Sequence, residues 1–337
     1  MSIIGVGNAL TDIIIDIPSE SVLDRLGFPL GGMYMIEEED HYRLLDIISG
    51  YPHSFAAGGS AANTINGLAK LGLPVAFTGK VGNDITGREF AADQTTSGIS
   101  TWLEVSDDMP SGKCISMVLE GGERTMATYL GSSINVSGHE LTPQRLKENK
   151  ILYVEGYIVY NRALIEDVMR RAKEAGLMVA LDLASYNVVK DNREVLHYLV
   201  AEYVDIIFAN QQEAFEFTGL DEREALESLA EFSKIAVVKT GACGSLVARG
   251  KDRFHVGVID DAIPRDKTGA GDLYASGFLY GLCKGYSLDV CAEIGAILSS
   301  KVIEVAGPKM DECQWSEIRG LVERIENGDH VVAVESI

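Results

Sequence analysis

The stretch Asp-Lys-Thr-Gly-Ala-Gly-Asp at residues 266–272 lies between a turn-rich segment and a long apolar run with the pattern of a helix. The N–H groups of Gly269, Ala270 and Gly271 would converge at the N-terminus of a helix over about residues 272–283, where negative charge is favoured. Asp272 would stand beside the bound anion as a general base for phosphoryl transfer. The alternative is a Gly-rich turn in which Asp272 is a first-turn helix acid without chemistry.

This segment and its helix resemble the C-terminal signature of the PfkB, or ribokinase-like, family of carbohydrate and nucleoside kinases. The usual form there is Asp-Thr-Thr-Gly-Ala-Gly-Asp, and Lys267 replaces its second residue. A second stretch, Ala-Gly-Gly-Ser-Ala-Ala-Asn at residues 57–63, resembles the N-terminal signature of the family. Residues 7–12 and 58–63 look most like the adenosine-kinase branch. Similarity extends over nearly the whole chain and includes residues 5–8, 210–213, 239–241 and 307–308.

Composition fits an enzyme with a large core. The 337 residues are 46% apolar, and this length predicts about two domains. The net charge of −21 comes from 29 basic and 50 acidic side chains that are spread along the chain, which argues against a nucleic-acid surface. A bound triphosphate would therefore have to be neutralised locally by amides, a few cations and a metal.

Cysteine usage and the N-terminus bear on location. Five cysteines form no Cys-x-x-Cys pair, which predicts reduced thiols in a cytoplasmic protein. Asp12 and Asp16 interrupt the N-terminal apolar run, so we expect neither a signal peptide nor a membrane span. The resemblance is compatible with both a monomer and a homodimer.

Short β-rich runs alternate with amphipathic helical stretches, a pattern that predicts an α/β fold with a mainly parallel sheet. Gly72, Gly176 and Gly219 stand where helices would end. The predicted helices are residues 61–71, 162–175, 223–232 and the run after Asp272. The predicted buried strands are residues 2–6, 75–78, 151–154, 178–181, 206–209 and 235–239.

Residues 13–36 and 100–130 break this alternation with short β-branched segments and turns. We interpret them as a small β lid, and residues 1–12, 37–99 and 131–337 as the α/β core. A plain β meander at the domain edge is the alternative. The resemblance implies a ribokinase-like three-layer sandwich with such a lid over the acceptor, where it would exclude water. Arg124 would lie on the lid and either reach the transferring phosphate or pair with an acidic residue.

The N-terminal motifs predict the acceptor site. Asp12 follows the first strand, at the end of a parallel strand where ligands of such sheets bind, and its carboxylate can accept two hydroxyl hydrogen bonds from a sugar. Gly58 and Gly59 would let the backbone approach the sugar, and Asn63 offers a donor and an acceptor. The alternatives are a solvated loop acid, a turn, an N-cap at Ser60 and an exposed Asn63.

Residues after two later strands predict the ATP side. The Asn-x-x-Glu pattern at Asn210 and Glu213 resembles residues that lie near Mg²⁺ and the phosphates, with the carboxylate acting partly through water. The same two residues fit a helix capping box, and both interpretations can hold together. Thr240, Gly241 and Gly244 resemble the family's phosphate-facing turn. Lys239 before them either adds charge or is simply solvated at a strand end.

Asp266 and Thr268 resemble residues at the potassium sites of some relatives, with Thr268 also expected at ATP. Lys267 already supplies a positive charge there, so K⁺ dependence and independence both stay open. Side chains that would recognise a base, with Phe55, Tyr129 and Tyr157 as candidates, are not placed by the sequence.

Motifs of other enzyme classes are incomplete. The Gly-Lys pairs at residues 79–80 and 112–113 lack the rest of a P-loop, residues 5–10 supply only two of the three dinucleotide-binding glycines, and no zinc motif occurs. The sequence thus predicts an ATP- and Mg²⁺-dependent kinase that phosphorylates a primary hydroxyl of an adenosine-like nucleoside or a sugar. The alternatives are a ribokinase, fructokinase or 2-keto-3-deoxygluconate type of sugar kinase, or a non-catalytic binder on the same fold.

Overall fold

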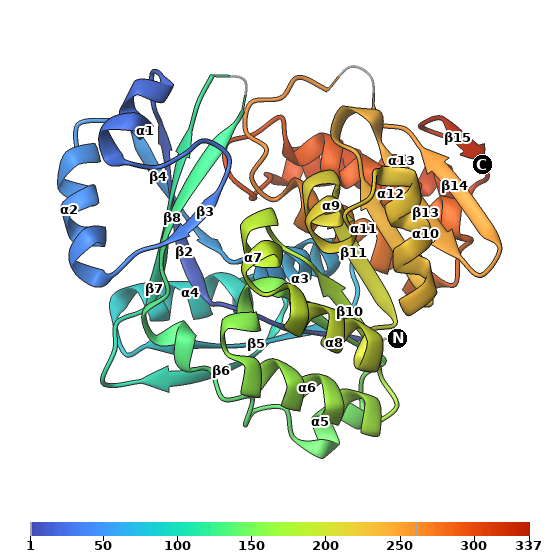
Figure 1. The fold of residues 1–337 in the computed structure, drawn as a ribbon, viewed down its shortest axis with the longest axis horizontal. Coiled ribbons are helices and arrows are strands. Elements are labelled where there is room, and N and C mark those ends of the chain that lie inside the picture. The colour runs from blue at the N-terminus through green and yellow to red at the C-terminus, as the bar shows by residue number, and fades with distance from the viewer. Residues whose placement is uncertain (1, 121, 260–261) are drawn as a thin grey trace.

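The computed structural model describes residues 2–120, 122–259 and 262–337. Within these residues the main sheet runs in the order β15-β14-β13-β12-β11-β10-β9-β1-β5-β6 and is parallel from β12 to β6 (Figure 1). All six predicted buried strands are confirmed in it. Its strands are β1 (Ile3–Val6), β5 (Val75–Gly82), β6 (Ser100–Ser106), β9 (Ile151–Glu155), β10 (Met178–Asp182), β11 (Ile206–Asn210), β12 (Ile235–Lys239), β13 (Ser245–Arg249), β14 (Asp252–Val256) and β15 (Val334–Ser336).

Helices cover both faces of this sheet (Figure 1) because the strands are apolar on both sides. Successive side chains of β1 point to opposite faces of the sheet, so Ile3 packs into one core and Ile4 into the other. The first core is completed by α3 (Ser60–Lys70), α4 (Ile85–Thr96), α11 (Ala270–Lys284), α12 (Leu288–Val302) and α13 (Glu312–Glu326). The second is completed by α5 (Pro143–Lys147), α6 (Arg162–Glu174), α7 (Tyr186–Asp191), α8 (Arg193–Tyr203), α9 (Gln211–Thr218) and α10 (Glu222–Phe232). The expected three-layer α/β sandwich is confirmed.

A second, smaller sheet stands beside the sandwich (Figure 1), in the order β3-β8-β7-β2-β4. Alternation along its strands separates two faces. Ile13, Ile115 and Ala127 pack against the two helices of this part, whereas Asp12 and Thr128 line a cavity on the other face. The elements are β2 (Leu10–Asp16), α1 (Glu20–Leu26), β3 (Met33–Met35), α2 (Glu38–Ile48), β4 (His53–Gly58), β7 (Gly112–Val118) and β8 (Arg124–Tyr129).

The boundaries of the small part differ from those expected. Residues 100–106 form β6, which pairs with β5 in the main sheet and not with the lid. Strand β4 pairs with β2 in the small sheet, whereas the sequence predicts these residues in the core. The segment 13–36 also contains helix α1, which the pattern did not predict. Pairing between distant strands is not encoded in local pattern, so these assignments needed the tertiary structure. Residues 1, 121 and 260–261 of the expected parts lie outside the described residues.

Helices in the described part of the chain are too short or too polar to serve as bilayer spans.

Candidate active site

A cavity of about 350 Å³ lies where the carboxyl ends of the central strands meet the small sheet and the N-terminus of α11. This edge of a parallel sheet is the usual place for a ligand in an open α/β fold. Predicted site residues come together here from distant parts of the sequence. Those that line the cavity are Asp12, Gly59, Asn63, Arg124, Asn210, Glu213, Gly241, Gly244, Thr268, Gly269, Ala270, Gly271 and Asp272.

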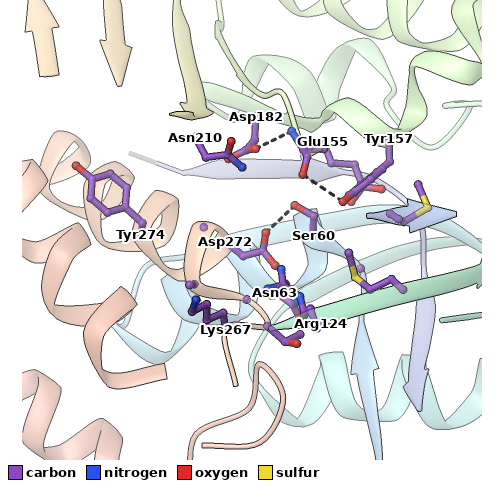
Figure 2. A pocket seen from close by; sticks show the side chains of 18 of the residues that line it. Ser60, Asn63, Arg124, Glu155, Tyr157, Asp182, Asn210, Lys267, Asp272 and Tyr274 are labelled. Carbon is purple, nitrogen blue, oxygen red and sulfur yellow. Dashed lines mark hydrogen bonds between the residues drawn. The ribbon is translucent and has the colours of Figure 1, made fainter. Parts of the chain in front are cut away.

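Asp272 lies in the first turn of α11 and is held from α3. Ser60 Oγ donates to Asp272 Oδ1 at 2.7 Å and Asn63 Nδ2 donates to Oδ2 at 2.9 Å, as Figure 2 shows. Burial raises the pKa of Asp272, while these two hydrogen bonds oppose the rise. A carboxylate that is fixed in place and more basic than usual is suited to take a proton.

The hydrogen bonds of Ser60 and Asn63 in the structure differ from those expected from the sequence. Gly59, with φ +97°, occupies the N-cap position of α3, and Ser60 makes no cap. Both Ser60 and Asn63 hold the carboxylate of Asp272, which leaves the buried Oδ1 of Asn63 without a hydrogen-bond partner among the described residues. The orientation of Asn63 toward Asp272 depends on the packing of α3 on α11, which no local pattern shows.

The glycine-rich turn opens onto the cavity. Gly269 adopts φ +78°, and a Cβ there would lie 2.7 Å from Pro308 Cβ, so this position requires glycine. The N–H of Ala270 donates to the Lys267 carbonyl at 3.2 Å, which occupies one of the three expected amides. The Gly271 amide is therefore better placed than the Ala270 amide to bind an anion.

Whereas the sequence predicts Asp12 at the end of a strand of the main sheet, it lies within β2 of the small sheet and lines the cavity. A Cβ on Gly58 would lie 2.1 Å from Asp12 Oδ2, so glycine at position 58 makes room for the carboxylate rather than contacting the cavity itself. Burial, and then the charge of Asp272, raise the pKa of Asp12 to about 7. Arg124 from β8 and Lys309 lower it. The Nε of Arg124 is buried without a partner among the described residues, so its guanidinium retains a donor for a ligand.

Asn210 and Glu213 form the capping box of α9. Asn210 N and Nδ2 donate to the two carboxylate oxygens of Glu213 at 2.7 and 2.6 Å, and Glu213 N donates to Asn210 Oδ1 at 2.9 Å. Burial raises the pKa of Glu213 to about 7, whereas Lys239 lowers it. The capping interpretation is confirmed, and both side chains also line the cavity.

The turn after β12 forms part of the wall of the cavity. Gly241 adopts φ +61° and Gly244 φ +92°, and a Cβ at Gly244 would lie 2.0 Å from the Val256 carbonyl oxygen. Thr240 lies beside the cavity, and its buried hydroxyl has no partner among the described residues. Lys239 is not solvated: its side chain is 14% exposed and forms an ion pair with Asp182 at 2.7 Å.

Asp266 is turned away from the cavity and organises the loop. Its carboxylate accepts from Thr268 N at 2.8 Å, from Thr268 Oγ1 at 2.7 Å and from Gly307 N at 2.7 Å. Lys267 forms an ion pair with Glu123 of the small sheet's β7–β8 turn. Both oxygens of Asp266 are thus already engaged by protein donors.

Several residues that line the cavity are not predicted by the sequence. Tyr157 lines the cavity as one of the named candidates, but Phe55 is 67% exposed and Tyr129 does not line it. Asp182 could have been found because it directly follows a predicted strand. An apolar wall comes from positions that carry no motif, namely Leu10, Met33, Met35, Met126, Leu130 and Tyr160.

The chain is similar in structure and in sequence to known proteins. A structure of adenosine kinase from Sinorhizobium meliloti has a TM-score of 0.90 and 34% identity and covers 95% of this chain and 98% of its own, which confirms the ribokinase-like fold. The 5-dehydro-2-deoxygluconokinase of Shouchella clausii is 29% identical over 79% of this chain and 86% of its own. Adenosine kinase of Saccharomyces cerevisiae is 26% identical over 75% and 79%. The pfkB family carbohydrate kinase model matches residues 52–312, so the chain belongs to this family of carbohydrate and nucleoside kinases.

Proposed function

We propose that the protein transfers the γ-phosphoryl group of ATP to a primary hydroxyl of an adenosine-like nucleoside. The observation that carries this proposal is Asp272, whose carboxylate is fixed by Ser60 and Asn63 at the open N-terminus of α11. Asp272 takes the proton of the acceptor hydroxyl while the hydroxyl oxygen forms a bond to the γ-phosphorus. The bond between the γ-phosphorus and the bridging oxygen of the β-phosphate breaks, which releases ADP. The Gly271 amide and the α11 dipole stabilise charge on the transferred group.

In this proposal Asp12 accepts hydrogen bonds from the sugar hydroxyls and Arg124 reaches the phosphate from the small sheet. Gly241, Gly244, Thr240 and Thr268 surround the phosphates and the nucleotide. Bound Mg²⁺ would neutralise phosphate charge. In the described residues no group of three or more metal-binding side chains gathers, which fits a metal held mainly by phosphate oxygens and water, with Glu213 beyond a water. The proposal also includes a K⁺ ion beside Asp266. The carboxylate oxygens of Asp266 already accept hydrogen bonds from protein donors.

The apolar wall favours a nucleoside over a sugar. Met33, Met35, Met126 and Tyr157 line the cavity near the small sheet and offer a surface for a flat base, whereas a free sugar presents mainly hydroxyls. A sugar remains the second candidate because the 5-dehydro-2-deoxygluconokinase relative shares the fold, and Asp12 would hold ring hydroxyls equally well.

The test is ADP release with Mg-ATP across a panel of nucleosides and sugars. Turnover with adenosine or a related nucleoside supports the proposal, and turnover only with a sugar acid or sugar replaces it by the second candidate. Acceptor binding by calorimetry without turnover on any compound would identify a non-catalytic binder and contradict the proposed function.

We also propose that the small sheet acts as a lid that closes on the acceptor. Amide protons of β7 and β8 should exchange more slowly when acceptor is added, because the ligand would bridge these strands to the core. Hydrogen exchange followed by mass spectrometry measures this, with β13, which lies in the main sheet, as an internal control. Unchanged exchange in β7 and β8 at saturating acceptor would contradict lid closure.

A further inference from the structure

Lys239 is a buried cation at the end of β12. Its Nζ pairs with Asp182 Oδ2 at 2.7 Å, at the end of β10 two strands away. Asp182 is itself fixed, because its Oδ1 accepts from Ala184 N at 2.9 Å, and Ala184 has the unusual φ of 72° for a non-glycine residue. Burial disfavours the charge on Lys239, but Asp182 and Glu213 outweigh it and raise the pKa, so the amine stays protonated.

This ammonium group lies against the glycine-rich turn. A Cβ on Gly271 would be 3.0 Å from Lys239 Nζ, the nearest described atom outside Gly271, its chain neighbours and its own helix backbone. Lys239 therefore lies directly beside the first turn of α11, next to the amide that the proposed function gives to the phosphoryl group. Only one of the three ammonium donors is used by Asp182, which leaves two for a ligand in the cavity.

The charge of the cavity makes this position important. Five carboxylates line the cavity: Asp12, Glu155, Asp182, Glu213 and Asp272. The cations among the lining residues are Arg124, Lys239 and Lys267. Arg124 is on the small sheet, and Lys267 pairs with Glu123 of that sheet's turn. Lys239 is the cation supplied by the main sheet, and a polyphosphate would otherwise meet mostly negative charge there.

We propose that Lys239 contacts the phosphate oxygens of the nucleotide beside the Gly271 amide, and that Asp182 positions it. This inference rests on the proposed function and adds a catalytic residue to it. The competing explanation is that Lys239 is only a counter-ion that stabilises the buried Asp182 and Glu213. The two explanations differ in what removal of the ammonium does to nucleotide affinity.

The experiment titrates Mg-ATP and, separately, the acceptor into Lys239→Met by calorimetry. Loss of a charge-assisted hydrogen bond should weaken Mg-ATP binding about 10- to 100-fold and leave acceptor affinity unchanged. Asp182→Asn should weaken Mg-ATP binding less, because the ammonium remains but is no longer held. Lys173→Met is the matched control, since Lys173 pairs with the buried Asp205 at 2.6 Å and does not line the cavity.

Unchanged Mg-ATP affinity in Lys239→Met, with a lower melting temperature, would show the counter-ion role and overturn the inference. Equal loss of ATP and acceptor affinity would overturn it as well. If Lys239→Met does not fold, Lys239→Gln removes the charge but keeps a polar donor, and the same titration applies: a loss confined to ATP supports the contact, and wild-type affinity contradicts it. Binding is measured without turnover, so failure of the kinase proposal in the acceptor panel remains a separate result.

Discussion

Asp272→Asn should lower kcat by about 10²-fold or more, because the amide cannot take the proton of the attacking hydroxyl. The side chain keeps its size, and its oxygen can still accept from Ser60 or Asn63. The pKa of Asp272 is raised chiefly by burial, so the neutral amide should not destabilise the fold. Single-turnover kinetics with saturating ATP and acceptor measure the chemical step directly.

A matched control separates chemistry from helix capping. Asp289 is also an acid in the first turn of a long apolar helix, α12, but does not line the cavity. If Asp272 were only a helix-terminal acid, both Asp→Asn variants would lose about 0.3–1 kcal/mol of stability and neither would lose turnover. Near-normal kcat in Asp272→Asn would remove it from the base role.

Asp12→Asn should weaken acceptor binding about 10- to 100-fold, because hydrogen bonds to a charged carboxylate are replaced by weaker ones. Burial and Asp272 raise the pKa of Asp12 to about 7, so it is protonated below this pH and ionised above it. Acceptor affinity of the wild type should therefore increase as pH rises from 6 to 8, and this increase should be smaller in the variant. Calorimetry at several pH values measures both effects.

The same raised pKa predicts the sign of the stability change. An acid whose pKa is higher in the folded state stabilises the fold at low pH, and this contribution is lost as pH rises from the unfolded value toward 7. At pH 8 the melting temperature of Asp12→Asn should thus equal or exceed that of the wild type. Acceptor affinity at the wild-type level at pH 8 would show that Asp12 is not a ligand.

Gly58→Ala tests the role of the Asp12 carboxylate without changing Asp12 itself. Its Cβ would lie 2.1 Å from Asp12 Oδ2 and should displace the carboxylate, with a similar loss of acceptor affinity. Gly50→Ala is the control, since a Cβ there would meet no atom within 4 Å and its φ is not in the left-handed region. Loss of affinity in both variants would point to general disruption of the small sheet.

Features that depend on the local backbone conformation could be predicted from the sequence. The glycine-rich turn at residues 266–272, the buried strands and the capping box at Asn210 and Glu213 are all local, because a positive φ, an apolar run or a helix cap depends on a few neighbouring residues. Asp272 could be named as a candidate because it ends the glycine-rich turn, and Asp12 because it follows the first strand within a few residues, although it lies in β2. Asn63 could be named for its chemistry, but the sequence does not show that its amide holds Asp272.

Three features depended on distant pairing. The small sheet takes β4 from a segment expected in the core, and β6 lies in the main sheet. The wall of Met33, Met35 and Met126 arises because β3 pairs with β8 across about ninety residues of chain. No single position in these strands carries a motif, so their chemistry emerges only from the pairing.

The sequence by itself determined the family, the layered α/β architecture and the identities of the two central carboxylates, because these follow from local pattern and motif. Only the tertiary structure decided what surrounds each carboxylate. Burial and neighbouring charges move the pKa of Asp12 to about 7, and packing of α3 on α11 fixes Asp272. It also placed Lys239 beside Gly271 rather than in solvent. Electrostatics and hydrogen bonding act through space, and the distances between groups far apart in the chain exist only once the chain has folded.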